Sequence, residues 1–296
     1  MKNIAESVKA RLKNISDAKG VDFNFFCLIY FQERFLYRLS MSKYSDNFIL
    51  KGGFMLHFLN TSEFRPTKDI DFLGLKIKND SDKLKDIIKE ICSLQYEDGV
   101  IFDTKSVEAS VIKEGHDYEG TRMKFIARLG SVRNIITIDI GFGDTVLPEP
   151  LKKHFTGLLQ TDNALLNIYP FETVVSEKFE AIVSLNYMTS RMKDFYDIRF
   201  IAHNQEFDLT ILKKSIVATF LKRSTKLSGS NIIFSDEFRN DRDKQIQWSA
   251  FLRRNKIEVT FDFKDVVKFI EKFLAPVLSP SDADMKWNPL KLEWIK

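Results

Sequence analysis

Two aspartates separated by a single residue, Asp69 and Asp71, have the clearest capacity for chemistry in this sequence. The stretch around them alternates as a strand does, and residues two apart on a strand point to the same face. Two carboxylates side by side among apolar residues repel each other unless a cation neutralises them. Mg²⁺ prefers carboxylate oxygens and keeps positions open for phosphate, so the pair predicts a Mg²⁺ site. The structural alternative is a solvated Asp pair at the start of a strand.

Two other features flank this pair in the sequence. Lys51-Gly52-Gly53 falls at an expected strand-to-helix junction, where glycines let backbone N–H groups approach a phosphate at a helix N-terminus. Asp139 stands alone in an apolar, β-branched stretch, where an unpaired carboxylate is costly. We therefore expect the Asp139 strand to lie beside the Asp69 strand and supply a third metal ligand. An ordinary turn and a strand-end ion pair are the respective alternatives.

A third group of polar residues lies in the second half of the chain. Lys178 falls on an expected helix, and Asp194 and Asp197 share one face of the next helix because they are three residues apart. The polar side chains could line a cleft between the two halves of the chain; the alternative is that Asp194 and Asp197 form salt bridges with Arg191 and Lys193 on a solvated face.

The elements that must position these residues differ between the two halves of the chain. Up to residue 169 helices and strands are mixed; helices are expected at 1–18, 22–41, 54–59 and 83–94, and strands at 48–50, 69–75, 100–113, 120–129 and 134–141, with a possible edge strand at 165–169. Beyond Pro170 only helices are expected, at 170–187, 192–204, 208–224, 242–255 and 264–275. The predicted class is α+β, with a mixed-sheet domain over 1–169, including two N-terminal helices, and a helical domain over 170–296.

Composition excludes several classes of protein. Of the 296 residues 44% are hydrophobic and 29% charged, as in ordinary globular chains, and 12 Gly with 7 Pro exclude collagen-like sequences. The 2 cysteines are too few and too far apart for a disulfide framework or a cysteine zinc site. The longest apolar run, residues 25–31, is far shorter than the roughly 18 residues of a membrane span. We expect a cytoplasmic protein with no membrane partner.

Positive charge is concentrated in one segment. Residues 213–256 contain eleven Lys and Arg against four acidic residues, although the formal net charge of the whole chain is only +4. A basic segment beside an acidic remainder favours a polyanion such as RNA as partner; exposed charge that only aids solubility is the alternative.

Taken in order, the motifs resemble those of the AbiEii/AbiGii toxin family, nucleotidyltransferases of the DNA polymerase β-like superfamily. The resemblance covers residues 23–205 and rests on Gly52-Gly53, Arg65-x-Thr67-x-Asp69-Ile70-Asp71, Ile138-Asp139-Ile140-Gly141-Phe142-Gly143-Asp144, Lys178-x-x-Ala181 and Arg191-x-Lys193-Asp194-x-x-Asp197. It implies a nucleotidyltransferase-like mixed sheet with a C-terminal helical lobe. The wider superfamily often has Gly-Ser at the glycine motif, so no serine hydroxyl is available at Gly53.

The resemblance also implies roles for individual residues. Asp69, Asp71 and Asp139 would bind metal, with two Mg²⁺ ions expected, and would be catalytic together with Lys178 and Asp194. Nucleotide binding would involve Lys51, Gly52, Gly53, Lys178 and Asp197.

The implied activity is metal-dependent transfer of a nucleotide from an NTP to an acceptor such as RNA or tRNA. The protein would act as a toxin of a bacterial toxin–antitoxin or phage-defence system, with a cognate antitoxin as a possible partner. One alternative is a non-catalytic protein that binds nucleic acid or a partner through a degenerate nucleotidyltransferase fold; another is nucleotide transfer to a protein or a small molecule.

Overall fold

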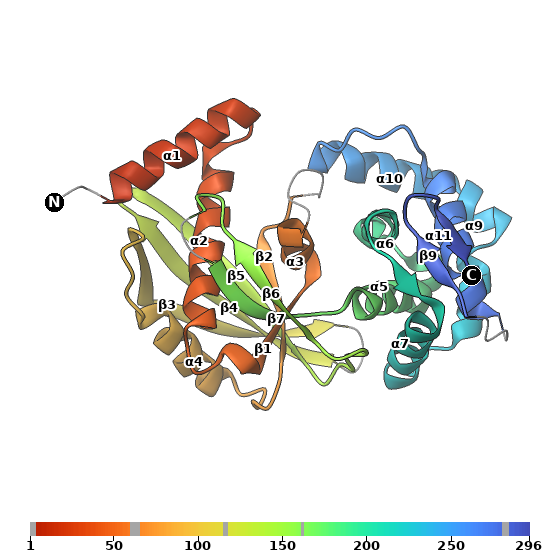
Figure 1. Ribbon diagram of the computed structural model, residues 1–296, viewed down its shortest axis with the longest axis horizontal. Helices are drawn as coiled ribbons and strands as arrows, with labels where there is room; N and C mark the ends of the chain where they lie inside the picture. The colour runs from red at the N-terminus through yellow and green to blue at the C-terminus, as the bar shows by residue number, and fades with distance from the viewer. Residues whose placement is uncertain (1–3, 60–65, 115–117, 161–162, 280–283) are drawn as a thin grey trace. The chain divides into compact units, whose positions relative to one another are not determined.

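The computed structural model describes residues 4–59, 66–114, 118–160, 163–279 and 284–296, and the chain divides into two compact units (Figure 1). The first unit comprises Met1–Gly143 and Leu151–Ile168, and the second comprises Asp144–Pro150 and Tyr169–Lys296. The segment Asp144–Pro150 thus packs with the second unit, whereas the predicted ranges were 1–169 and 170–296. Arg65 of the sequence motif lies outside the described residues.

A seven-stranded mixed sheet forms the centre of the first unit, in the order β3-β4-β5-β2-β1-β7-β6. Parallel ladders join β1 to β7 and β2 to β5, and the other neighbours are antiparallel. The strands are β1 (Phe48–Lys51), β2 (Asp69–Gly74), β3 (Val100–Glu114), β4 (Tyr118–Leu129), β5 (Val132–Phe142), β6 (Leu151–Thr156) and β7 (Asn163–Ile168).

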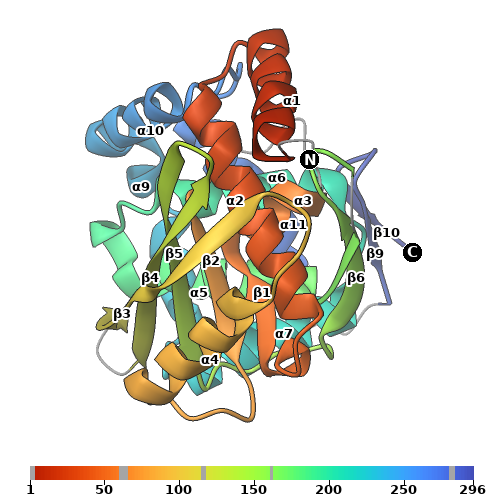
Figure 2. The same ribbon diagram turned by 90° about the vertical axis from the view of Figure 1, so that its left-hand side faces the viewer.

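Helices α2 (Phe23–Ser40) and α4 (Ser81–Ser93) cover one face of this sheet, as Figure 2 shows. Alternate residues of β5 meet them: Ile136, Ile138 and Ile140 are fully buried, because side chains two apart on a strand share a face. The Asp22 side chain accepts a hydrogen bond from the Phe25 N–H and so begins α2, as its residue type predicted. The remaining helices of this unit are α1 (Ile4–Lys19) and α3 (Gly52–Leu59), with a short 3-10 turn, η1 (Ser45–Asn47).

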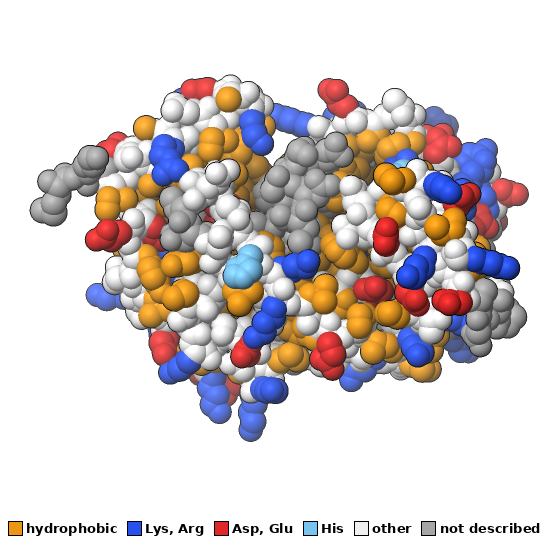
Figure 3. Space-filling view, in the orientation of Figure 1, with side chains coloured by type: hydrophobic (Ala, Val, Ile, Leu, Met, Phe, Trp, Pro, Cys, Tyr) orange, Lys and Arg blue, Asp and Glu red, His pale blue; other side chains and the backbone are white. Residues whose placement is uncertain are grey.

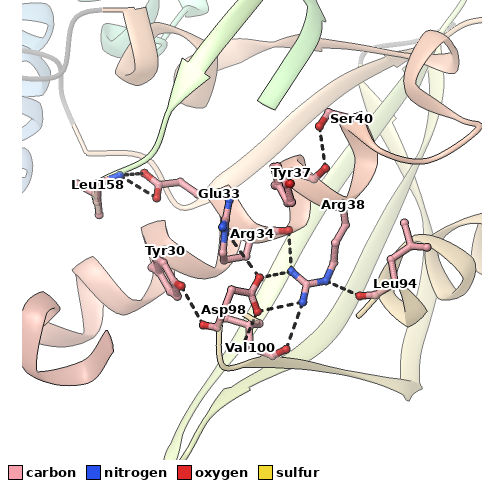
Figure 4. A network of polar contacts seen from close by, with 10 residues as sticks. All are labelled: Tyr30, Glu33, Arg34, Tyr37, Arg38, Ser40, Leu94, Asp98, Val100 and Leu158. Carbon is pink, nitrogen blue, oxygen red and sulfur yellow. Dashed lines mark hydrogen bonds and ion pairs between the residues drawn. The ribbon is translucent and has the colours of Figure 1, made fainter. Parts of the chain in front are cut away.

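A buried ion pair joins α2 to the start of β3 (Figure 4). The Arg38 guanidinium donates to both carboxylate oxygens of Asp98, at 2.6 and 3.2 Å, and to the backbone carbonyls of Leu94 and Val100. Tyr30 Oη donates to the Asp98 carbonyl at 2.9 Å. Because both charges are buried and hydrogen-bonded, the pair holds α2 in place against the start of β3.

The second unit is mostly helical. Its helices are α5 (Phe171–Leu185), α6 (Met192–Asn204), α7 (Leu209–Lys222), α8 (Ser230–Ile233), α9 (Asp236–Asn240), α10 (Arg242–Asn255) and α11 (Phe263–Leu278), with 3-10 turns η2 (Asn186–Met188) and η3 (Leu227–Gly229).

The prediction of helices alone beyond Pro170 is wrong. A three-stranded sheet in the order β10-β9-β8 is formed by β8 (Phe207–Asp208), β9 (Lys286–Asn288) and β10 (Glu293–Ile295). Strands of two or three residues are too short to show an alternating pattern, so tertiary contacts define them. Trp287 anchors this sheet: its side chain is fully buried and Nε1 donates to the Ala202 carbonyl at 2.6 Å.

The predicted α+β class, a mixed sheet flanked by helices, is confirmed. Two details at the sheet edge differ: β7 lies inside the sheet, between β1 and β6, and the edge strand is β6. β6 has only one buried residue, Phe155, and so gives no apolar alternation to predict it. No helix in the described part of the chain is both long and apolar enough to cross a bilayer.

Candidate active site

A row of four charged residues crosses the sheet of the first unit. Lys51 is opposite Asp71 in the β1–β2 ladder, and Asp71 is opposite Asp139 in the β2–β5 ladder. Asp139 in turn is opposite Arg122 of β4. Residues directly opposite each other on neighbouring strands project from the same face. The four side chains therefore share one face of the sheet, in the order positive, negative, negative, positive.

Asp69 lies on the same face, one row away. It is two residues before Asp71 and opposite Thr137 of β5, which is itself opposite Lys124 of β4. Ile70, between the two aspartates, is fully buried on the other face. The structure thus places all three predicted carboxylates on one face, with the Asp139 strand beside the Asp69 strand as the sequence predicted.

Gly52 and Gly53 form the first turn of α3, directly after β1. A β-carbon added at Gly52 would lie 2.0 Å from Asp71 Oδ2, and the residue has a positive φ of 71°. The Asp71 carboxylate is therefore packed against the start of α3, where backbone N–H groups and the helix dipole favour anions such as phosphate. The Lys51 ammonium points along the same face, 3.8 Å from where a β-carbon at Gly141 of β5 would be.

Arg122 holds Asp139 in a two-point ion pair. Its Nε and NH2 donate to the two carboxylate oxygens of Asp139, each at 2.7 Å. The hydrogen bonds to Asp139 raise the pKa of Arg122, although partial burial opposes this, and the charges of Asp139, Asp69 and Asp71 raise it further. Arg122 is therefore part of the carboxylate cluster, and it was not among the residues predicted from sequence.

Asp69 and Asp71 fit the carboxylate ligation that Mg²⁺ prefers. They share a face beside a helix N-terminus suited to the phosphates that complete Mg²⁺ coordination. Among the described residues, however, no group of three or more His, Cys, Asp and Glu side chains is arranged to hold a metal ion. Asp139 has both oxygens on Arg122, so its role as a third ligand stays a prediction, and Arg122 competes with a metal ion for this carboxylate.

The second unit brings Lys178 of α5 together with Asp194 and Asp197 of α6. Lys178 Nζ donates to Asp194 Oδ1 at 2.8 Å and to Asp197 Oδ2 at 2.6 Å, and Arg191 Nε donates to the other oxygen of Asp194. Both aspartates are buried, so the alternative of salt bridges on a solvated face does not describe them. The two carboxylates fix the position of the Lys178 ammonium.

The charges around Asp194 keep it ionised inside the protein. Burial alone would raise the pKa of this carboxyl group. The positive charges of Lys178, Arg191 and Lys193, with the hydrogen bond from Lys178, outweigh burial and hold the pKa of Asp194 well below its usual range. Lys178 therefore compensates two buried anions, and its loss would leave buried negative charge without its nearest cation.

The basic segment over residues 213–256 is less continuous than its sequence indicates. Several of its cations make internal contacts, among them Lys213 with the Ser279 carbonyl, Arg223 with Asp144 and Glu180, Arg239 with Glu271, and Lys244 with the Thr189 carbonyl. The exposed ones are Lys214, Lys222, Lys226, Arg242, Arg253, Arg254 and Lys256. On the face shown in Figure 3, Lys and Arg side chains are interspersed with acidic and apolar ones rather than gathered in a single patch.

The chain was compared with known families and structures. Residues 34–268 match the sequence model of the family described as nucleotidyl transferase AbiEii toxin, Type IV TA system. Two solved structures from Helicobacter pylori are similar to this chain. JHP933 has 15% sequence identity and a TM-score of 0.44, and the match covers 80% of this chain and 84% of that chain. The other, whose name includes the word nucleotidyltransferase, has 16% identity and a TM-score of 0.46, and the match covers 83% of this chain and 89% of that chain. No curated protein matches significantly.

The family match spans about four fifths of the chain, from α2 into α11, and includes both groups of candidate site residues. The chain belongs to the AbiEii nucleotidyl transferase toxin family.

Proposed function

We propose that this protein transfers a nucleotide from an NTP to RNA in a Mg²⁺-dependent reaction and acts as a toxin. One observation carries the proposal: Asp71 packs against Gly52 at the start of α3, with Asp69 on the same face. This arrangement sets two carboxylates beside a helix N-terminus, the combination that a cation-bound triphosphate requires. The exposed cations of residues 213–256 support a polyanionic acceptor such as tRNA.

The proposed reaction is an in-line displacement at the α-phosphate of the NTP. An acceptor hydroxyl oxygen forms a bond to that phosphorus while the bond to the bridging oxygen of the β-phosphate breaks. Pyrophosphate leaves, and the hydroxyl proton is released to solvent. Negative charge grows on the leaving oxygens, so the site must supply fixed positive charge.

The residues of this chain divide these tasks. Asp69 and Asp71 would hold Mg²⁺, joined by Asp139; the bound ion would stabilise the attacking and leaving oxygens. Lys51, Gly52 and Gly53 bind the phosphates through side-chain charge and the N-terminus of α3. Lys178 offsets charge on the leaving phosphates, while Asp194 and Asp197 act as positioning residues that hold its ammonium. A cognate antitoxin would control a cytoplasmic toxin of this kind.

The experiment is incubation of the purified protein with α-labelled NTPs, Mg²⁺ and total RNA. We expect label transfer to RNA that is lost in Asp71→Asn and in Lys178→Met. Asp82→Asn, a change of the same type at an exposed residue of α4, is the matched control and should keep full activity. Transfer that survives Asp71→Asn would overturn the mechanism.

The same experiment distinguishes the non-catalytic alternative. The two-point contact of Arg122 with Asp139 is the observation that favours it. In a site that has lost its catalytic activity, Asp139 is no longer needed as a metal ligand and can form an ion pair instead. RNA binding without label transfer to any fraction, at any tested NTP, would favour that alternative. Toxicity on expression that Asp69→Ala abolishes would favour the enzyme.

A further inference from the structure

The β4–β5 hairpin extends beyond the start of β2 and carries positive charge there. β2 begins at Asp69, opposite Thr137, whereas β5 begins at Val132. The face shared with Asp139 therefore continues along the hairpin past the end of its neighbour. On this extension and the row next to it lie Lys124, Ile126 and Arg128 of β4 and Arg133 and Ile135 of β5.

Two like charges stand directly opposite each other at the far end of this face. Arg128 is the cross-strand partner of Arg133, and both side chains are exposed. Neither guanidinium forms a hydrogen bond or an ion pair with a residue in the described part of the chain. Like charges directly opposite each other destabilise a sheet, and a bound anion would turn this repulsion into attraction.

Two exposed apolar side chains lie next to the arginines. Ile101 of β3, opposite Arg128, is 63% exposed, and Ile135 of β5, two residues from Arg133, is 55% exposed. Two acidic residues lie on the same face: Asp103, opposite Ile126, whose Oδ1 accepts the Lys105 N–H, and Glu108, opposite Lys124. At Arg128 and Arg133, two exposed cations would face a bound anion from neighbouring strands, with apolar side chains beside them.

The spacing of the cations matches a nucleic-acid strand. Arg128 is six residues from Arg122 along β4, roughly 20 Å at the rise of a strand, with Lys124 between them. An RNA strand that follows this face for 20 Å passes several phosphates, each of which carries one negative charge.

We propose that this surface, the hairpin face (Lys124, Arg128, Arg133, Ile101 and Ile135), binds the phosphate backbone of the acceptor RNA several nucleotides from its reacting end. The inference rests on the proposed function and specifies which surface of the first unit holds the acceptor. Phosphates contact the arginines, and the isoleucines contact ribose or base. Such backbone contacts position the strand without reading its sequence.

The test is direct RNA binding in the absence of NTP, measured by fluorescence anisotropy with a labelled 12-nucleotide RNA and a labelled trinucleotide. The variant is Arg128→Ser with Arg133→Ser. We expect about tenfold weaker binding of the 12-mer and a salt slope reduced by about two, with unchanged binding of the trinucleotide and of NTP. The variant should melt no lower than the wild type, because a repulsive pair is removed.

The matched control is Lys83→Ser with Lys89→Ser. These exposed lysines lie on α4, on the opposite side of the sheet (Figure 2), and their removal changes net charge equally. Equal weakening in the control, or unchanged 12-mer binding in the arginine variant, would overturn the inference while leaving nucleotide transfer to RNA intact. No RNA binding by the wild type would overturn the proposed acceptor as well. Poly-glutamate binding as tight as RNA binding, and equally lost in the arginine variant, would assign the face to an acidic protein instead.

Discussion

The carboxylate of Asp71 occupies the space that a side chain at residue 52 would need. A β-carbon on Gly52 would lie 2.0 Å from Asp71 Oδ2, and the positive φ of 71° independently favours glycine. Both requirements act where β1 ends and α3 begins. The glycine is therefore what allows a metal-binding type of side chain to approach the N-terminus of a helix.

Gly52→Ala should displace Asp71 and destabilise the protein by more than the backbone cost alone. Gly20→Ala is the matched control, because Gly20 has a φ of 63° but nothing within 4 Å of an added β-carbon. The control should lose about 1–2 kcal/mol in the free energy of unfolding, measured in urea. Gly52→Ala should lose more than the control and also weaken Mn²⁺ binding. Equal losses with unchanged Mn²⁺ binding would show that Asp71 does not depend on Gly52.

Arg122→Gln should strengthen the binding of divalent cations severalfold. The variant removes a positive charge that acts on Asp69 and Asp71 and frees both oxygens of Asp139. Isothermal titration with Mn²⁺ measures the affinity, and Lys83→Gln on α4 controls for net charge. Weaker Mn²⁺ binding in Arg122→Gln would indicate that the guanidinium organises the carboxylates rather than competing for them.

Lys178→Met should destabilise the second unit strongly, by about 3–5 kcal/mol, because two buried carboxylates lose their shared cation. Adding Asp197→Asn restores equal numbers of charges around Arg191 and should recover part of this loss. Urea unfolding measures both variants. Under the proposed mechanism, nucleotide transfer should stay absent in the double variant, because the positive charge of Lys178 is still missing. Transfer that returns together with stability would make the role of Lys178 purely structural.

Glu33→Gln should change the pH dependence of stability. Burial raises the pKa of Glu33 to about 8, although the hydrogen bond from the Leu158 N–H and the charge of Arg34 oppose this (Figure 4). In the unfolded chain the Glu33 carboxyl group releases its proton at about pH 4.3, whereas in the folded chain it keeps the proton up to about pH 8. The contribution of protonated Glu33 to the free energy of unfolding is therefore complete below about pH 4.3 and is lost as the pH rises toward 8. The introduced amide does not titrate, yet its oxygen still accepts from Leu158. The variant should gain stability relative to wild type between about pH 5 and pH 8, measured in urea; parallel profiles would contradict the prediction.

The face of the sheet on which the site residues lie was predictable from sequence, but some of the ion pairs among them were not. The one-residue spacing of Asp69 and Asp71 in an alternating stretch was enough to place both on one face. A missed signal lay in the hairpin: the turn at Gly130-Ser131 brings Leu129 opposite Val132, and counting back along both strands sets Arg122 opposite Asp139. The burial of Asp194 could not be inferred in the same way, because its partner Lys178 lies on another helix. Helix spacing identifies residues that share a face but not what that face meets.

Lys51, Asp71, Asp139 and Arg122 form one row only because each of the four strands that carry them turns the charged residue toward the same face of the sheet. Inserting one amino acid inside any of these strands would rotate everything beyond it by half a period and turn a charged group into the apolar interior. Insertions in the longer connections carry no such penalty, whereas the two-residue turn Gly130-Ser131 sets the β4–β5 register and an insertion there would shift it. Divergent copies of this chain are therefore free to vary in the length of those longer connections, while the even–odd numbering inside the four strands and the length of the β4–β5 turn must be kept.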